Sequence, residues 1–337
     1  MRATGIGSLP GEEYAEATRM VLGELGESPG MPHLPELPAR GATASMTGRA
    51  LAVLADLDAD LQPAGWRLTG SSGAPGVDHR RARSLLAQDL DAVEELTHDS
   101  GRFDPAGGFK IQLAGPWTLA ATVERPRGDK ILADHGARRE LAQALAEGLR
   151  DHVRDVRRRV GAERLVVQLD EPALAAVHAG RVPTASGYGR HRSVDRPELT
   201  ETLGWVLEAI TAEDAEPWVH SCAPQTPWEL VRTAGAVGLA ADLGVLSAAD
   251  HDQFAEAIEA GQTVALGVVP SLDPAPDAVP TDKAAVERAL RWLDMLGLDP
   301  EEHGERLVLT PTCGLAGASA AWAGRAMTLT RQAATAF

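Results

Sequence analysis

The stretch RLVVQLDEPALAAVHAG, residues 164–180, shows the pattern that decides the fold. Its first part is an almost continuous apolar run that ends at Asp170, and its second part has the composition of a helix. A strand without alternation of apolar and polar residues is typical of a parallel sheet that is covered on both faces. The stretch therefore predicts one strand–helix unit of an α/β fold.

The same unit recurs along the chain. Apolar segments followed by a turn and a helical pattern also occupy residues 3–8, 109–115, 217–221, 236–242, 263–269 and 306–312. GWRLTG, residues 65–70, is either an eighth strand or part of a hairpin. We therefore expect a (β/α)8 TIM barrel that forms a single catalytic domain over residues 1–337. A doubly wound open sheet is the alternative, although the chain has neither GxGxxG nor GxxxxGK[ST].

Three stretches rich in Pro or Gly interrupt this repeat, at residues 28–45, 69–79 and 270–281. Long loops that follow barrel strands usually serve the active face, so we expect loop insertions at the C-terminal face. Residues 131–159 predict one long charged helix with a solvated face.

Composition narrows the class of protein. The chain of 337 residues is 44% hydrophobic and carries a formal net charge of −16. Nucleic acid and anionic membranes would repel such a chain, so neither is an expected partner. Two cysteines exclude a disulfide framework, and no apolar run has the length of a signal peptide or a membrane span. These features predict a cytoplasmic protein.

Polar side chains gather where the predicted strands end, which is where a barrel builds its active site. They are Ser8, Asp170, Glu171, His220, Cys222, Asp242 and Cys313, and they include both cysteines of the chain. One histidine, two cysteines and a carboxylate suit a tetrahedral Zn²⁺ site. Considered alone, Cys222 could equally be a small apolar core residue, and His220 could equally be a hydrogen-bonded histidine of the core.

Four motifs carry a resemblance to a known family. TGIGSLPG, QLDEPAL, VHSCAP and TPTCGLAG, which begin at Thr4, Gln168, Val219 and Thr310, resemble in the same order motifs of the catalytic barrel of cobalamin-independent methionine synthase. The chain is similar to the compact, single-barrel form of that family, without the extra N-terminal barrel of the long enzymes. The resemblance implies a zinc-dependent methyltransferase that converts homocysteine into methionine.

The resemblance also implies roles for individual residues. His220, Cys222 and Cys313 would bind zinc, and Asp242 would stand where the family has a glutamate ligand, unless water takes that place. The turn Ile6–Gly7–Ser8, next to a predicted helix, would hold the substrate carboxylate. Glu36 and Asp170 would be the catalytic and substrate-binding carboxylates that hold the ammonium. Glu36 also fits an ordinary loop carboxylate, Ser8 a helix N-cap, and Glu171 the first turn of its own helix.

The chain departs from the family on the side of the methyl donor. The family places a histidine after the strand that corresponds to residues 263–269, whereas this chain reads GVVPSLDPAPD there. The family's folate-stacking tryptophan is also not evident, and Trp117 is either a donor-site aromatic or a core residue. These departures put folate use in question and favour methylcobalamin on a corrinoid protein, or another donor without a polyglutamate tail, because a corrinoid leaving group needs no proton. Methylfolate and methylcobalamin both stay open as donors from the sequence.

Other functions remain open from the sequence. A related thiol alkyltransferase with a different acceptor would use the same metal site. A metal-free decarboxylase on a related barrel would not explain why both cysteines follow strands. A protein that binds zinc or a thiol without turnover would differ from the enzyme only in forming no product.

Overall fold

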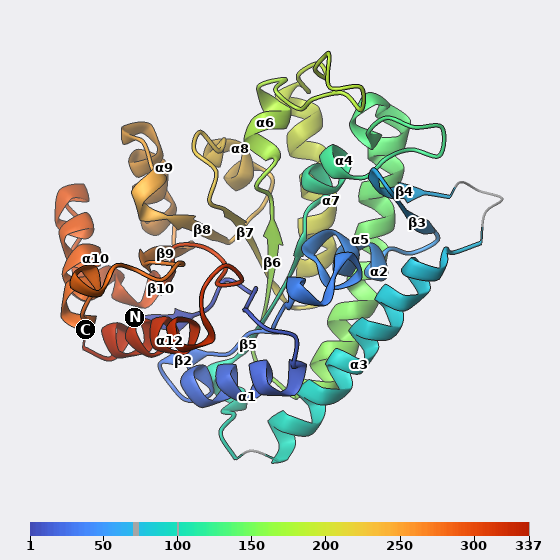
Figure 1. Cartoon of the computed structure of the whole chain (residues 1–337). Coiled ribbons are helices and arrows are strands. Elements are labelled where there is room, and N and C mark those ends of the chain that lie inside the picture. The colour runs from blue at the N-terminus through green and yellow to red at the C-terminus, as the bar shows by residue number, and fades with distance from the viewer. Residues whose placement is uncertain (70–73, 100, 337) are drawn as a thin grey trace.

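The computed structural model describes residues 1–69, 74–99 and 101–336, which form a sheet of eight parallel strands surrounded by helices (Figure 1). Neighbouring strands follow the order β2-β1-β10-β9-β8-β7-β6-β5. The strands are β1 Arg2–Thr4, β2 Gly30–Met31, β5 Phe109–Ala114, β6 Leu165–Asp170, β7 Glu216–Ser221, β8 Gly238–Asp242, β9 Thr263–Val269 and β10 Leu307–Pro311. All except β2 fall on strands predicted from the sequence.

Strand β2 corrects the prediction that residues 28–45 are only a loop. It has two residues, and prolines lie on both sides of it, so no apolar run marks it in the sequence. Just beyond β2, His33 forms a parallel bridge with Lys110 at the start of β5. The backbone N–H of Leu34 donates to the Lys110 carbonyl at 2.8 Å, and the backbone N–H of Lys110 donates to the Pro32 carbonyl at 2.9 Å. These bonds close the barrel, so the open doubly wound alternative is wrong.

The segment GWRLTG belongs to a hairpin, which was the second alternative for it. Strand β4 (Gly65–Leu68) pairs antiparallel with β3 (Ala59–Gln62) outside the barrel. The loop predicted at 69–79 lies only partly within the described residues, because 70–73 are outside them. The loop predicted at 270–281 is present between β9 and the next helix.

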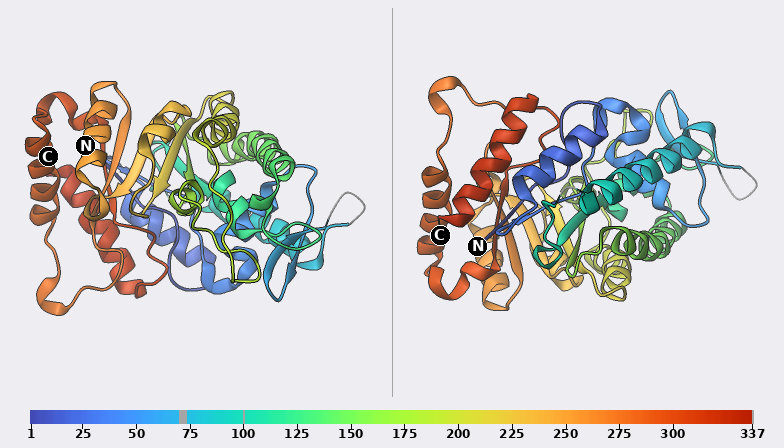
Figure 2. Two further views of the ribbon diagram at one scale, coloured as in Figure 1. Left: turned by 90° about the horizontal axis from the view of Figure 1, so that it is seen from above. Right: turned by 90° about the horizontal axis from the view of Figure 1, so that it is seen from below.

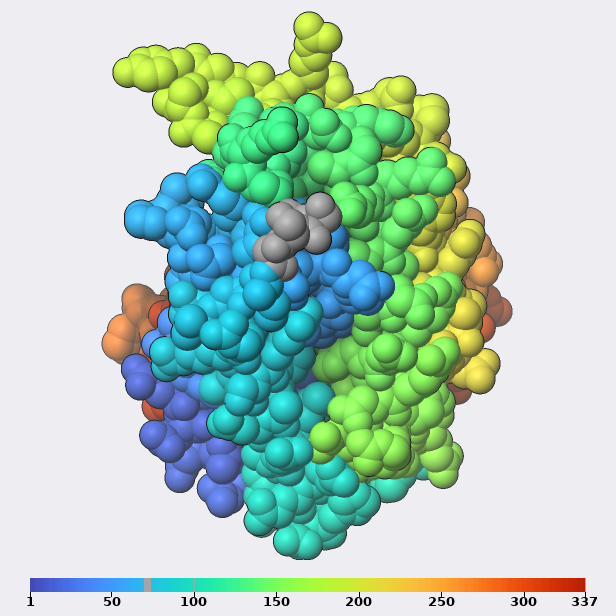
Figure 3. All heavy atoms as spheres, turned by 90° about the vertical axis from the view of Figure 1, so that its right-hand side faces the viewer, coloured from blue at the N-terminus to red at the C-terminus, as the bar shows by residue number. Residues whose placement is uncertain are grey.

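Helices cover the outside of the barrel. The long charged helix predicted at 131–159 is α5, and α3, which was not predicted, lies beside it on one face of the molecule (Figure 3). The first and last helices, α1 and α12, are neighbours, which brings both ends of the chain together (Figure 2). The helices are α1 Tyr14–Leu25, α2 Met46–Val53, α3 Val77–Asp99, α4 Pro116–Thr122, α5 His135–Val160, α6 Leu174–His178, α7 Arg196–Thr211, α8 Trp228–Thr233, α9 Ala248–Glu259, α10 Asp282–Leu296, α11 Pro300–His303 and α12 Ala320–Thr335. No helix in the described ranges is long and apolar enough to span a membrane.

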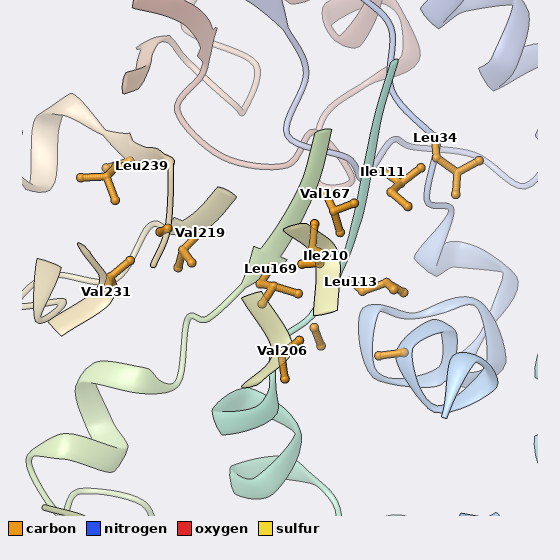
Figure 4. Close-up of a cluster of buried hydrophobic side chains, with 14 of the residues drawn as sticks. Leu34, Ile111, Leu113, Val167, Leu169, Val206, Ile210, Val219, Val231 and Leu239 are labelled. Carbon is orange, nitrogen blue, oxygen red and sulfur yellow. The ribbon is translucent and has the colours of Figure 1, made fainter. Parts of the chain in front are cut away.

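Alternate residues of the strands face the helices and the barrel lumen. On β5 and β6, Leu113, Val167 and Leu169 pack outward toward Val206 and Ile210 of α7 (Figure 4). A separate apolar cluster, which we call the plug, fills the lower lumen with Met31, Val166, Trp218, Ala240, Ala265 and Val308. Above the plug, the lumen-facing residues become polar, and they lead up to the C-terminal ends of the strands.

Candidate metal centre and substrate pocket

Three of the predicted metal ligands lie together at the C-terminal end of the barrel. Nitrogen or sulfur atoms of His220, Cys222 and Cys313 all lie within 4.8 Å of one another. His220 is on β7, Cys222 directly follows that strand, and Cys313 lies two residues beyond β10. Nε2 of His220 is 2.9 Å from Sγ of Cys222, whose thiol donates to the Thr312 carbonyl at 3.1 Å. One imidazole and two sulfurs at this spacing fit Zn²⁺, and they leave a tetrahedral position open for a further ligand.

The other ring nitrogen of His220 is held by a carboxylate. Nδ1 of His220 lies 2.7 Å from Oδ1 of Asp170, which also accepts a hydrogen bond from Nε2 of Gln168 at 2.8 Å. A carboxylate on Nδ1 fixes the ring so that Nε2 faces the metal position, as in many metal sites with a histidine ligand. This arrangement is a second reason why the residues suit a metal ion.

The charges of the cluster are strongly coupled. Burial alone would lower the pKa of His220, but its hydrogen bonds with Asp170 and Cys313 raise that pKa to about 9. Contact with the Cys222 thiol and with His220 lowers the pKa of Cys313, despite burial. The neighbouring Cys313 and burial raise the pKa of Cys222. Because a metal takes a neutral imidazole and thiolates as ligands, its binding would release protons from the cluster.

Asp242, the predicted fourth ligand, is near the cluster but not within it. The ligand atoms that lie within 4.8 Å of one another, among the residues that the structure describes, do not include its carboxylate. Asp242 ends β8, and its Oδ1 accepts the backbone N–H of Gly244 at 2.7 Å. Its charge contributes to the raised pKa of Cys222, which places it close enough to act on that sulfur.

The predicted substrate residues line one cavity with the metal cluster. This cavity, of about 260 Å³, is lined by Ile6, Gly7, Ser8, Glu36, Pro38, Met46, Gln112, Asp170, Pro172, His220, Cys222, Cys313 and Gly314. Ser8 forms a parallel bridge with Glu36, and a side chain at Gly314 would clash with the Ser8 hydroxyl. Helix α1 begins only at Tyr14, so Ser8 does not cap it and the turn is not at a helix N-terminus.

Glu36 is a buried carboxyl group and not an ordinary loop residue, since only 3% of it is exposed. Burial raises the pKa of Glu36 to about 7, while nearby Arg49 opposes this shift and Asp170 adds to it. Nε of Arg49 lies 3.9 Å from its Oε1, and Nε2 of Gln112 donates to the same oxygen at 3.2 Å. The ammonium group of a bound amino acid would stabilise the ionised form of such a buried carboxyl group.

The side chains of Glu171 and Trp117 hold neighbouring elements of the fold together. Glu171 is fully buried and does not serve its own helix, because it accepts the backbone N–H groups of Trp117 and Thr118 at the start of α4, at 2.9 and 2.7 Å. The Thr118 hydroxyl donates to it at 2.7 Å. Trp117 is 0% exposed, and its indole N–H donates to the Leu199 carbonyl at 3.1 Å. Trp117 is therefore a core residue and not an aromatic of the donor site.

Three buried polar residues were not predicted: Gln112, which lines the cavity, and Lys110 and Gln168, which lie beneath it. They sit at alternate positions of β5 and β6, within FKIQLA and LVVQLD. The signal was present in the sequence, because polar residues two apart in an otherwise apolar barrel strand face the lumen.

Comparison with known proteins agrees with the motifs. A family model described as the catalytic domain of cobalamin-independent synthase matches residues 107–336. The chain belongs to this family. The matched residues include Asp170, His220, Cys222 and Cys313. A cobalamin-independent synthase gives no support to the expected methylcobalamin donor or corrinoid partner, and this family fits a folate donor instead.

Solved structures support the fold of this synthase family. A B12-independent methionine synthase from Shewanella sp. W3-18-1, in complex with selenomethionine, matches with a TM-score of 0.60 and 14% identity, over 100% of this chain and 97% of that chain. At this identity, the match supports the barrel fold alone. An oxaloacetate acetylhydrolase bound to oxalate, with a TM-score of 0.25 and 15% identity over 64% of this chain and 71% of that chain, is too dissimilar to carry an argument. No curated protein sequence matches the chain.

Proposed function

We propose that the chain, acting as one catalytic barrel over residues 1–337, is a zinc-dependent methyltransferase that methylates the thiol of homocysteine to form methionine. The observation that carries the proposal is the His220–Cys222–Cys313 cluster at the wall of a cavity of about 260 Å³ that also exposes two carboxyl groups. A cavity of this volume suits an amino acid better than a larger cofactor.

The metal would be held by Nε2 of His220 and the sulfurs of Cys222 and Cys313, with the second carboxylate oxygen of Asp242 as the fourth protein ligand when no acceptor sulfur occupies that position. Zinc, when bound, would keep the acceptor sulfur as a thiolate at neutral pH. Asp170 would hold the His220 ring in the tautomer that leaves Nε2 free for the metal.

The chain's own residues would orient the acceptor. Glu36 and Asp170 would accept hydrogen bonds from its ammonium, and the Ile6–Gly7–Ser8 turn would bind its carboxylate through backbone N–H groups and the Ser8 hydroxyl. Both ends of the amino acid would then be fixed, which would direct its sulfur toward the cysteines. Holding a reactant in the correct orientation accounts for much of the rate increase of an enzymatic reaction over the same reaction in solution.

The methyl donor that we propose is a methylated folate. In the transfer, the sulfur–methyl bond forms as the nitrogen–methyl bond of the donor breaks, and the electron pair stays on that nitrogen, which takes up a proton. Membership of a cobalamin-independent family supports this donor over methylcobalamin.

The test is product formation. Zinc-loaded protein is incubated with homocysteine and either methyltetrahydrofolate or methylcobalamin, and methionine is measured by mass spectrometry. We expect methionine from the folate, and none from the Cys313→Ser variant. Absence of methionine with both donors would leave a zinc- or thiol-binding protein without turnover. Methionine from methylcobalamin alone would overturn the choice of donor.

A further inference from the structure

Lys110 is an unusual residue for this chain. The 32 basic residues include only three lysines, Lys110, Lys130 and Lys283. Lys110 is 0% exposed and lies in the lumen, between the plug and the floor of the substrate cavity. Burial lowers its pKa to about 8, while the charges of Asp170 and Glu36 act in the opposite direction, so Lys110 still carries its proton at pH 7. A buried charge is costly, so it calls for a reason beyond the filling of space.

Its ammonium group has three acceptors for its three N–H bonds. Nζ donates to the Ile6 carbonyl at 2.8 Å, to Oε1 of Gln168 at 3.0 Å and to Oε1 of Gln112 at 3.4 Å. Each of these partners belongs to, or directly contacts, one of the three groups assigned above to substrate recognition.

The lysine fixes which way the two glutamine amides face. An ammonium has no acceptor atom, so each glutamine must turn its carbonyl oxygen toward Nζ. Each NH₂ group therefore points away from the lysine. Nε2 of Gln168 donates to Asp170 at 2.8 Å, and Nε2 of Gln112 donates to Glu36 at 3.2 Å.

The third acceptor lies in the turn proposed to bind the substrate carboxylate. The Ile6 carbonyl receives Nζ of Lys110 and also Nε2 of Gln168, the latter at 3.1 Å. This carbonyl belongs to the peptide that contributes the N–H of Gly7. Two donors on it fix the orientation of that peptide at the cavity wall.

We propose that Lys110 is a positioning residue for the amino-acid end of the acceptor, because it orients Glu36, Asp170 and the 6–8 turn through Gln112, Gln168 and the Ile6 carbonyl. The inference rests on the proposed function, since it concerns the same cavity. It assigns Lys110 to recognition of the amino acid and not to direct contact with the metal cluster, because within the described residues its ammonium group donates to Ile6, Gln112 and Gln168 and not to His220, Cys222 or Cys313.

The experiment compares two ligands on zinc-loaded protein by calorimetry: L-homocysteine and 1-propanethiol, which lacks the ammonium and the carboxylate. The variant is Lys110→Met. The control is Thr310→Val, because Thr310 is 1% exposed on β10 and, in the described part of the chain, its hydroxyl has no hydrogen-bond partner. Zinc content and melting temperature are measured for each protein.

We expect Lys110→Met to weaken homocysteine binding about tenfold or more and to leave propanethiol binding and zinc content unchanged. Thr310→Val should match the wild type with both ligands. Equal weakening of both ligands, or loss of zinc, would make Lys110 a purely structural residue and overturn the inference. Unchanged homocysteine binding would also overturn it. A wild-type protein that binds homocysteine no better than propanethiol would instead contradict the proposed function.

A second measurement covers the case in which Lys110→Met does not fold. Wild-type protein labelled with ¹⁵N-lysine should give three side-chain signals, and the exposed Lys283 serves as an internal reference. Homocysteine should shift the Lys110 signal, whereas propanethiol should not. An unshifted Lys110 signal at saturating homocysteine would contradict the inference.

Discussion

The carboxylate of Asp170 lies 2.7 Å from the imidazole of His220, on adjacent strands where the two residues pair in register. Asp170 also lines the substrate cavity, so a single side chain touches both the candidate metal ligand and the space for the acceptor. Its Oδ1 accepts hydrogen bonds from His220 and Gln168, and under the proposed function its other oxygen would bind the ammonium of the acceptor. One carboxylate would then contact both a zinc ligand and the acceptor.

Changing Asp170 to Asn should weaken zinc binding by about 10- to 100-fold, because the imidazole loses the acceptor that fixes its tautomer. Competition with a chelator measures this affinity. Asp104→Asn is the matched control, since Asp104 caps a short turn that precedes β5, at the opposite end of the barrel. Equal zinc affinity in the Asp170 variant and the control would contradict a supporting role for Asp170.

Replacement of either cysteine by serine should reduce bound zinc to well below one ion per chain, because an alcohol is a much poorer ligand than a thiolate. Metal analysis of the purified variants gives the stoichiometry, and circular dichroism tests whether they fold. Full zinc occupancy in a folded Cys222→Ser or Cys313→Ser protein would refute the ligand set.

Asp242→Ala should lower zinc affinity by less than either cysteine variant, because a carboxylate already bound to the Gly244 backbone must supply its other oxygen. The same chelator competition ranks the variants. If Asp242→Ala leaves zinc affinity unchanged, water is the better assignment for the fourth position.

The preference for homocysteine over propanethiol should fall as pH drops below 7. Since burial raises the pKa of Glu36 to about 7, Glu36 becomes neutral below that pH and loses its attraction for an ammonium. The ratio of the two affinities at pH 6 and 8 isolates this effect from ionisation of the thiol. Glu36→Gln should give a low ratio that does not change with pH.

The stability of that variant has a defined sign. A carboxyl group whose pKa is higher in the folded than in the unfolded state destabilises the fold as pH rises from the unfolded pKa to the folded pKa, which for Glu36 is from 4.5 to about 7. The free energy of unfolding of Glu36→Gln, minus that of the wild type, should therefore be larger above pH 7 than at pH 5. Chemical denaturation at both pH values measures the free energies of unfolding, and an opposite sign would contradict the raised pKa.

Glu171→Gln should lower the free energy of unfolding at pH 8 by about 2 kcal/mol, because an amide NH₂ would face the donors at the start of α4. Burial raises the pKa of Glu171 to about 7, above its value in the unfolded chain, so the wild-type carboxyl group contributes more stability at pH 5 than at pH 8 and the loss should be larger at pH 5. Denaturant unfolding at the two pH values checks this. A loss that does not depend on pH would argue against the raised pKa of Glu171.

Most of the barrel could be predicted because its strands are long and apolar. Strand β2 could not, since a two-residue strand between prolines has no periodicity to detect. His220, Cys222 and Cys313 were found because residue type and strand position agreed. The roles of Lys110 and Glu171 depend on side chains reaching across neighbouring strands and helices, which a linear sequence does not display.

The six apolar side chains of the plug close the lower end of the lumen. If the cysteines face a small acceptor in the cavity above the plug, a bulky methyl carrier that binds later would lie above the acceptor and cover it. Occupation would then be sequential, with the amino acid first to arrive and its methylated form last to depart. A carrier bound too early would obstruct turnover, so an excess of it should inhibit.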